Sequence, residues 1–525
     1  MRDFQIPNRS PAYGTRAMAA TSHPLATQAA LDAIREGGNA IDGALAAVAL
    51  LCVVEPHQTG IGGDAFALIA EPDGTLHGLN GSGRSPVAAD ADAISVQGLD
   101  AIPATSGHAV TVPGAVRAWE TLAARGHLGL ERLLAPAVAA ARDGFVVAPR
   151  VAFDWAGHLD LFARNPELGA RYSRDGAAPR AGDLWRLPDL AETLARIGRE
   201  GASAFYEGQV ADEIVATVSQ AGGTLTLDDL AAHDSEWVTP LRRSYRGHEV
   251  IELPPATQGL TALQMLGILE RFDIGALDPR GAEKFHLEIE AARLAYGVRD
   301  RDLADADHMA VPVEDLLGAP YLDRLAAEID LGRARPIGPP PGANHTDTVY
   351  LTVVDGEGRA VSLINSLFTG FGSGLCTPSG VVLQSRGSGF SLAPGHPNRI
   401  GPRKRPLHTL IPGLVLEDGL PTLSFGVMGG AYQACGHAHL LTNLIDHGLD
   451  VQAGLESPRA FFEGERVMLE TTLGAPVADT LRGLGHTVAP SATPIGGGQA
   501  IRIDRARGVL IGGSDPRKDG CALGL

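Results

Sequence analysis

The stretch Thr348–Leu367, TVYLTVVDGEGRAVSLINSL, contains two β-rich runs on either side of Asp355-Gly356-Glu357-Gly358-Arg359. Valine, isoleucine, threonine and tyrosine favour strands, and an Asp-Gly turn between two such runs is typical of a β-hairpin. If the turn spans Gly356 to Gly358, Thr348 lies opposite Ser366, and both side chains share one face of the sheet. A two-residue turn would instead place Asn365 opposite Thr348. The stretch therefore predicts a hairpin that gives Thr348 a hydroxyl or amide partner.

The residues that precede this hairpin, RARPIGPPPGANH (333–345), contain four prolines and two glycines. Proline cannot donate a backbone hydrogen bond, so an exposed loop is expected here. If the bond between Asp347 and Thr348 broke, Thr348 would carry both a hydroxyl and a free α-amine. An α-amine has a pKa of about 8 and can accept the hydroxyl proton near neutral pH. One residue would then supply nucleophile and base, although threonine also opens strands for purely structural reasons.

The rest of the chain shows a mostly helical first two-thirds with interspersed strands, followed by a strand-rich remainder. Apolar periodicity, glycine stops and turn residues predict short strands within 59–83. The same signals predict helices over 24–36, 40–56, 114–125 and 131–142, from near Glu283, and over 433–446. There is no internal repeat.

Composition narrows the possible partners. The chain has 525 residues, 44% of them hydrophobic, and a formal net charge of −18, which argues against nucleic-acid binding. Its short basic cluster, RIGPRKR (399–405), is expected to be a solvated loop. The cysteines (Cys52, Cys376, Cys435 and Cys521) form no CxxC pair, so neither zinc nor a disulfide framework is indicated. With no secretory signal and no membrane-spanning stretch in the sequence, we expect a cytoplasmic protein that needs no cofactor.

Several segments, in one order along nearly the whole chain, resemble the gamma-glutamyltransferase family. They are ATSHPLATQAALDAIREGGNAIDGALAAVALLCVVEPHQTGIGGD (20–64), VPGAVRAWE (112–120), ELPPATQGL (252–260), the hairpin itself, KRPLHTLIP (404–412), GVMGGAYQ (426–433) and GGSDPRKDGCALG (512–524). The resemblance implies an α+β fold, the four-layer αββα sandwich of N-terminal-nucleophile hydrolases. It also implies an inactive precursor that cuts itself between Asp347 and Thr348. The two products, 1–347 and 348–525, would remain associated as a heterodimer.

The resemblance also implies roles for individual residues. Thr348 falls at the nucleophile, and Ser366 falls where the family has a supporting threonine hydroxyl. Gly429 and Gly430 fall at the pair whose backbone amides form the oxyanion hole. Arg84 falls at the arginine that binds the carboxylate of the substrate. His408 and Thr409 replace two adjacent serines of the family.

Departures from the family pattern bear on the substrate. In QSRGSGFS (384–391), Ser388-Gly389 precede Phe390 where the family has an acid that holds an α-ammonium group. Phe368 replaces a family asparagine, and Arg386 adds a positive charge that favours a carboxylate. The loop between Asn398 and Gly401 is also shorter than in many members. The sequence therefore favours a small carboxylate-bearing amide lacking the α-amine, as in oxamate amidohydrolases or cephalosporin (glutaryl) acylases, with the oxamate branch preferred.

Two alternatives stay open. The first is gamma-glutamyl transfer or glutathione hydrolysis, with another residue holding the ammonium group. The second, from a different class, is an unprocessed binding protein that keeps the fold without catalysis.

Overall fold

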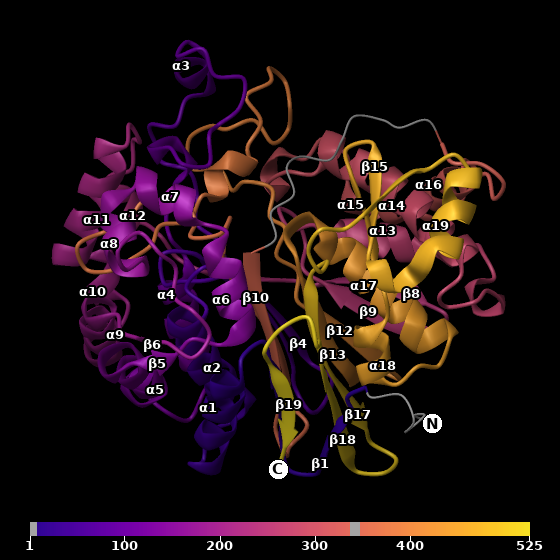
Figure 1. Cartoon of the computed structure of the whole chain (residues 1–525), viewed down its shortest axis with the longest axis horizontal. Helices are drawn as coiled ribbons and strands as arrows, with labels where there is room; N and C mark the ends of the chain where they lie inside the picture. Colours follow the sequence, from indigo (N-terminus) through magenta and orange to yellow (C-terminus); the bar gives the residue numbers. More distant parts are fainter. Residues whose placement is uncertain (1–7, 336–346) are drawn as a thin grey trace.

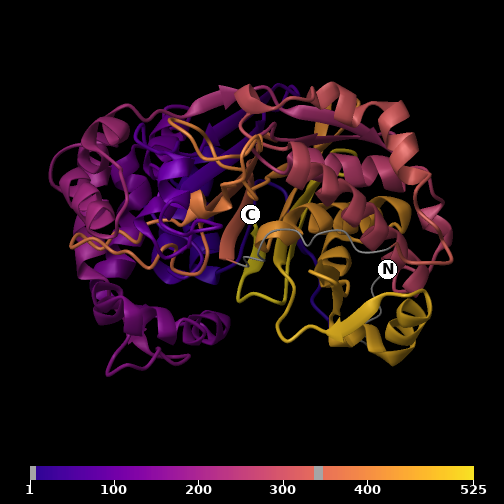
Figure 2. The same cartoon turned by 90° about the horizontal axis from the view of Figure 1, so that it is seen from above.

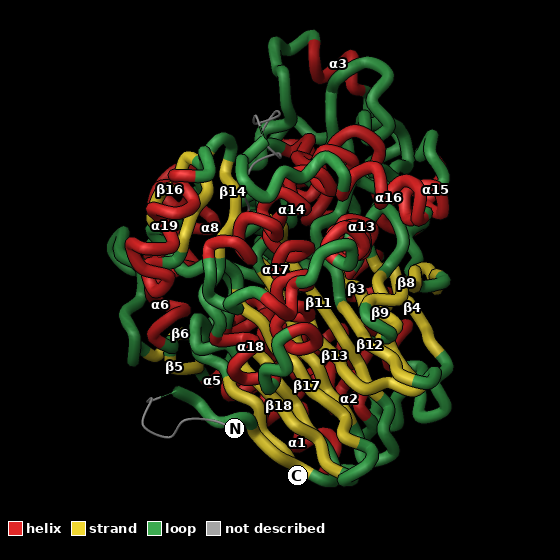
Figure 3. The backbone as a smooth tube through the Cα atoms, turned by 90° about the vertical axis from the view of Figure 1, so that its right-hand side faces the viewer, coloured by secondary structure: helices red, strands yellow, loops and turns green. Residues whose placement is uncertain are grey.

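The computed structural model describes residues 8–335 and 347–525, so most of the proline-rich stretch 333–345 lies outside the described residues. Two antiparallel seven-stranded sheets face each other and carry helices on their outer sides (Figures 1 and 3). The predicted α+β class and four-layer αββα sandwich are thereby confirmed.

Each sheet takes strands from both sides of position 348. The sheet that contains the predicted hairpin, called here the hairpin sheet, has the order β19 (Cys521–Gly524), β2 (Met18–Thr21), β10 (Asp347–Val354), β11 (Ala360–Phe368), β3 (Asp64–Ala70), β4 (Leu76–Gly81) and β7 (Glu236–Val238). The other, called the facing sheet, has the order β1 (Ala12–Gly14), β18 (Val509–Ser514), β17 (Gly497–Asp504), β13 (Leu420–Met428), β12 (Gly413–Glu417), β9 (His248–Glu252) and β8 (Leu241–Tyr245).

The helical layers divide along the chain, and Figure 2 shows the earlier helices on one side of the sheets and the later ones on the other. The earlier helices share one hydrophobic core with the hairpin sheet. They are α1 (Pro24–Arg35), α2 (Ala40–Val54), α4 (Ala115–Ala123), α5 (Leu130–Asp143), α6 (Pro149–Ala156), α7 (Leu159–Arg164), α8 (Pro166–Tyr172), α9 (Pro188–Glu200), α10 (Ser203–Tyr206) and α11 (Gly208–Gln220). Against the facing sheet pack α13 (Gly259–Leu269), α14 (Ala282–Asp302), α15 (Val313–Leu317), α16 (Ala319–Ala326), α17 (Gln433–Leu441) and α18 (Val451–Glu456).

Smaller elements complete the fold. They are α3 (Ala91–Ser95), α12 (Leu227–Ala231), α19 (Gly474–Gly483), the three-stranded sheet of β14 (Ala460–Glu463), β15 (Arg466–Leu469) and β16 (Thr487–Pro490), and the pair β5 (Phe145–Val146) and β6 (Leu184–Trp185). None of the helices in the described part of the chain combines the length and apolar character that a membrane span requires.

The hairpin β10–β11 has the predicted register over most of its length. Val349 pairs with Asn365 and Val354 with Ala360, and the amide of Asp355 bonds the carbonyl of Arg359 across the turn (3.1 Å). The three-residue turn is thus the correct alternative, and it brings Ser366 rather than Asn365 to the level of Thr348.

Side chains of β10 alternate between two cores, as the period of a strand requires. Val349, Leu351 and Val353 belong to the core on the helical side, whereas Tyr350 and Val354 belong to the core between the sheets. The same alternation directs Thr348 into the space between the sheets.

Candidate active site

Thr348 is buried beside Ser366 at the end of the hairpin. Its Oγ1 donates a hydrogen bond to Ser366 Oγ (3.2 Å), which also accepts one from the backbone N–H of Phe368 (2.8 Å). Asp347 pairs with Phe368 while Val349 pairs with Asn365, so β11 has one extra residue opposite Thr348. This β-bulge ends at Phe368, whose φ of 82° is strained for a bulky side chain. Irregular strand geometry of this kind is common beside active sites.

The facing sheet brings Gly429 and Gly430 to the level of Thr348. Thr352 Oγ1 lies 2.6 Å from Ser424 Oγ, and the Tyr350 ring covers Gly426, so the next step along the two strands sets Thr348 level with Met428. Gly429 and Gly430 follow β13 directly.

Both glycines have positive φ values, 130° and 56°, which favour glycine. The carbonyl of Gly429 accepts from the amide of Tyr432 (3.0 Å). Because carbonyl and N–H point in opposite directions within one peptide unit, this bond fixes the direction of the Gly430 N–H. The turn is therefore rigid, as an oxyanion hole requires.

Arg386 is a fully buried cation next to Phe368, at the same end of the hairpin as Thr348. Its Nη1 donates to Thr409 Oγ1 (3.3 Å), and its guanidinium lies 4.0 Å from the centre of the Phe368 ring. Among the described residues, neither Nε nor Nη2 has a hydrogen-bond partner. Burial lowers the pKa of Arg386 to about 9, with Asp64 opposing the shift, so the group keeps its charge at neutral pH. The two N–H groups without partners lie on one edge of the guanidinium. This edge can donate two parallel hydrogen bonds to one carboxylate.

His408 is neutral and offers one buried lone pair. Asp64 accepts from the backbone of Gly83 and Gly114 and from Gln384 through Oδ1, and its Oδ2 lies 2.9 Å from His408 Nε2. Burial, followed by the charge of Arg386, lowers the pKa of His408 to about 4. Nε2 therefore carries the proton, and Nδ1 is a buried acceptor with no partner in the described part of the chain.

Gln258, which the sequence reasoning missed, links the loop that contains Thr409 with the turn that contains Gly430. Its side-chain amide donates to the carbonyls of Thr409 (2.9 Å) and Gly430 (3.0 Å), and its Oε1 accepts from Arg299 (3.1 Å). Its backbone N–H also donates to the carbonyl of His408 (2.9 Å). A glutamine in a glycine- and proline-rich loop carries no sequence signal for this task, because its partners lie far away along the chain.

Arg84 lies in a different polar environment. Its guanidinium pairs with Glu236 (3.0 Å) and Asp305 (3.2 Å), and it lines a pocket of about 410 Å³ together with His233 and Arg403. Two carboxylates already neutralise this arginine, and its substrate-binding role stays a prediction.

The expectation that 399–405 is a solvated loop was wrong for two of its cations. Lys404 and Arg405 are buried. Arg405 pairs with Glu236 (3.0 Å), and its amide bonds Asp305 (2.8 Å). Both acids come from distant segments, so a charge run read in isolation could not reveal them.

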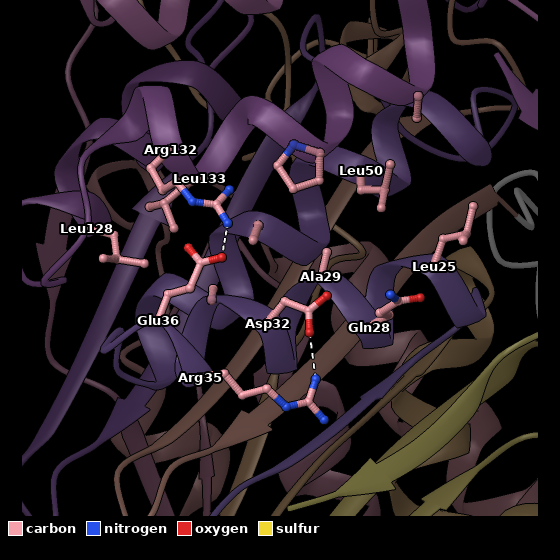
Figure 4. Close-up of a pocket in the computed structure, with 14 residues that line it drawn as sticks. Leu25, Gln28, Ala29, Asp32, Arg35, Glu36, Leu50, Leu128, Arg132 and Leu133 are labelled. Carbon is pink, nitrogen blue, oxygen red and sulfur yellow. Dashed lines mark hydrogen bonds and ion pairs between the residues drawn. The ribbon is translucent and has the colours of Figure 1, made fainter. Parts of the chain in front are cut away.

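A pocket of about 440 Å³ between α1, α2 and α5 holds none of the predicted site residues (Figure 4). Arg35 pairs with Asp32 there, and Arg132 with Glu36. These four charged side chains thus pair with one another, and the pocket contains none of the residues around Thr348.

Comparison with known proteins identifies the family of the chain. A family model described as gamma-glutamyltranspeptidase matches residues 26–525. The chain belongs to the gamma-glutamyltranspeptidase family. It is therefore an amidohydrolase of the proenzyme type, which excludes the non-catalytic alternative.

Individual members of the gamma-glutamyltranspeptidase family align over almost their entire length. The chain is 36% identical to the glutathione hydrolase-like YwrD proenzyme of Bacillus subtilis, over 98% of this chain and 99% of that one. It is also 36% identical to the oxamate amidohydrolase proenzyme of Klebsiella pneumoniae, over 97% and 98%. The crystal structure of cephalosporin acylase from Bacillus halodurans superposes with a TM-score of 0.94 at 39% identity, covering 100% of this chain and 99% of that one.

Proposed function

We propose that the protein cuts itself before Thr348 and then hydrolyses the amide of a small, carboxylate-bearing substrate of the oxamate type. The observation that carries this proposal is the buried edge of Arg386, where two N–H groups have no partner among the described residues. Leaving N–H groups of a buried cation without an acceptor is costly, so the arrangement is suited to an anionic ligand.

Thr348 is the nucleophile of the proposed reaction. In the precursor its Oγ attacks the carbonyl carbon of Asp347, and the Asp347–Thr348 C–N bond breaks as the nitrogen takes up the Oγ proton. Water then hydrolyses the resulting ester to the Asp347 carboxylate and the free Thr348 hydroxyl. In the mature enzyme the freed α-amine takes the Oγ proton while Oγ attacks the amide carbon. The N–H groups of Gly429 and Gly430 stabilise the oxyanion, and each such donor lowers the barrier by about 3 kcal/mol. The amine returns the proton to the leaving ammonia, and water hydrolyses the acyl ester.

The cut would also open the path to Arg386. Asp347 pairs with Phe368 at the end of β10, and the Phe368 ring lies against the Arg386 guanidinium. Releasing Asp347 frees that strand edge, so a substrate carboxylate could reach the fork. His408 Nδ1 would accept an N–H from the same ligand, a donor that oxamate possesses.

The two products, 1–347 and 348–525, would stay together. β10 lies between β2 and β11 in the hairpin sheet, and β9 and β12 are neighbours in the facing sheet. Separating the products would therefore break both sheets, so a stable heterodimer is the expected mature form.

Gamma-glutamyl hydrolysis is the second candidate, because the similar YwrD proenzyme is named glutathione hydrolase-like. Its substrates carry an α-ammonium group that needs a carboxylate. Asp64 is the acid paired with this cluster, and its oxygens are already engaged by Gly83, Gly114, Gln384 and His408. The electrostatics beside Arg386 therefore favour a substrate without that ammonium group.

Parallel assays separate the two candidates. Purified mature enzyme is given oxamate, with ammonia release as the readout, and a gamma-glutamyl anilide, with aniline release as the readout. We expect a higher kcat/KM for oxamate. The reverse order would establish the gamma-glutamyl candidate, and the uncut Thr348→Ala variant controls for background hydrolysis.

A further inference from the structure

A cavity of about 540 Å³ lies between α14, α16 and the chain that leads to Arg335, and the predicted site residues do not line it. Four arginines line it, Arg293, Arg301, Arg324 and Arg335, together with Tyr321 and Glu328. In a chain of net charge −18, such a group of guanidinium ions locally reverses the sign of the charge. Clustered cations around a concavity are the electrostatic feature expected of an anion site.

Arg293 is the innermost of these arginines, with a side chain only 10% exposed. Its Nη1 donates to Glu290 (2.8 Å) and to His486 Nδ1 (3.3 Å). Its Nε and Nη2 have no hydrogen-bond partner among residues 8–335 and 347–525. These atoms form one edge of the guanidinium, which is shaped to bind two oxygens of one anion.

Arg335 and Arg324 complete the lining. Arg335 Nη2 pairs with Glu328 (2.8 Å), and its buried Nη1 has no partner within the described residues. Arg324 is exposed and lies 4.6 Å from the centre of the Tyr321 ring. The acids that pair with the lining arginines, Glu290, Glu328 and Asp302, engage other nitrogens, so these buried N–H groups have no acceptor among the described residues.

We propose that this cavity, which we call the arginine cavity, binds a small oxyanion through Arg293, Arg324 and Arg335. The shared chemistry of the ligand is two or more anionic oxygens on one centre or on adjacent carbons, as in phosphate or a short dicarboxylate. The site does not depend on the function proposed for Thr348.

The position of the arginine cavity gives the anion a structural consequence. Arg335 is the last described residue before 336–346. Its amide bonds Glu290 (3.2 Å), and the amide of Ala334 bonds the carbonyl of Leu484 (2.7 Å). An anion shared by Arg293 and Arg335 would attach this stem to α14 at a second point, beside the bond to Glu290.

The proposal is tested by calorimetric titration of the full-length protein with inorganic phosphate and, separately, with oxalate at constant ionic strength. We expect saturable binding of phosphate at one site per chain, unchanged in Arg386→Gln, which removes the cation proposed to bind substrate. Arg324→Gln and Arg335→Gln should each weaken binding about tenfold. Arg333→Gln is the matched control, because Arg333 is exposed on the same stem outside the lining.

The two anions are compared in Arg386→Gln, because oxalate is the product of the proposed hydrolysis and would also bind Arg386 in the wild type. In that variant, tighter binding of phosphate indicates a free phosphate, and tighter binding of oxalate indicates a dicarboxylate. Arg293 is left intact, because its removal would strand the buried Glu290 and could unfold the protein. Absence of saturable binding of both anions to Arg386→Gln would overturn the proposal. Equal loss in Arg333→Gln would do the same, because it would show a general charge effect and an adventitious ion only.

Discussion

At the scale of single residues, Ser366 Oγ accepts hydrogen bonds from the Thr348 hydroxyl and from the Phe368 amide, and thereby orients Thr348. Thr348→Ala removes the attacking oxygen, so we expect an uncut chain with no detectable hydrolysis. Thr348→Ser keeps the hydroxyl and should still be cut, at a reduced rate. Gel electrophoresis and ammonia release measure both effects, and normal turnover by the alanine variant would exclude Thr348 as nucleophile.

The Arg386 fork gives a prediction about binding. Arg386→Gln should raise the KM for oxamate about 10- to 100-fold with a smaller change in kcat, because charge-assisted bonds are worth about 1.5–3 kcal/mol. A substrate amide without a carboxylate should be unaffected, and this makes it the control. An unchanged KM for oxamate would remove Arg386 from the binding site.

Arg84 is tested in the same assay. Arg84→Ala should weaken oxamate binding less than Arg386→Gln does, because Glu236 and Asp305 already neutralise Arg84. An unchanged KM would show that Arg84 only joins the loops that its ion pairs connect.

These residues also show what sequence can predict. The alignment of Thr348 with Ser366 follows from the period of a strand and the length of a turn, both local properties. The burial of Arg386 depends on Phe368 and on the loop of Thr409, which meet only in the folded chain. The residue types in the sequence thus indicated a substrate with a carboxylate. Only the structure shows that one edge of the Arg386 guanidinium has no hydrogen-bond partner among the described residues.

At the scale of elements, the site lies where two loops from the facing sheet meet the end of the hairpin. Gln258 bonds both loops, one through Thr409 and the other through Gly430. Gln258→Leu should therefore lower kcat about 10-fold or more and also raise KM, since both the oxyanion turn and the Arg386 partner lose support.

The matched control is Gln264→Leu, on helix α13, which begins directly after Gln258. Gln264 is also buried, and its amide bonds the carbonyl of Leu316 (3.0 Å), which is remote from the loops of the site. We expect this variant to lose thermal stability while its kinetic constants stay near those of the wild type. Equal kinetic effects in the two variants would show that loss of any buried glutamine in this region lowers activity, and would contradict the role given to Gln258.

At the scale of the whole molecule, buried neutral histidines make the fold sensitive to acid. Burial lowers the pKa of His23, His233 and His408 to about 4 each, below the ordinary value of 6.5. The unfolded chain thus binds more protons than the folded one between these values. Their stabilising contribution is fully present above pH 6.5 and is lost as the pH falls towards 4.

The Tm should therefore fall steeply between pH 6.5 and 4. His233→Gln should make this dependence shallower, because it removes one of these titrating groups. Differential scanning calorimetry across this range measures the effect, and a Tm independent of pH would contradict it.

The layered architecture was predicted through resemblance, and the alternating strands and helices agree with it. The assembly of both sheets from strands on either side of position 348 could not be derived from local pattern, because pairings such as β9 with β12 join distant segments. This interleaving is the reason to expect a cut chain that remains one folded body.

The intact mass of the purified, active protein tests the central claim most directly. Self-cleavage before Thr348 predicts two masses, those of residues 1–347 and 348–525, with threonine at the start of the second chain. A single mass of 54.6 kDa in a fully active sample would contradict it, because the backbone nitrogen of Thr348 would still be part of an amide and could not serve as a base.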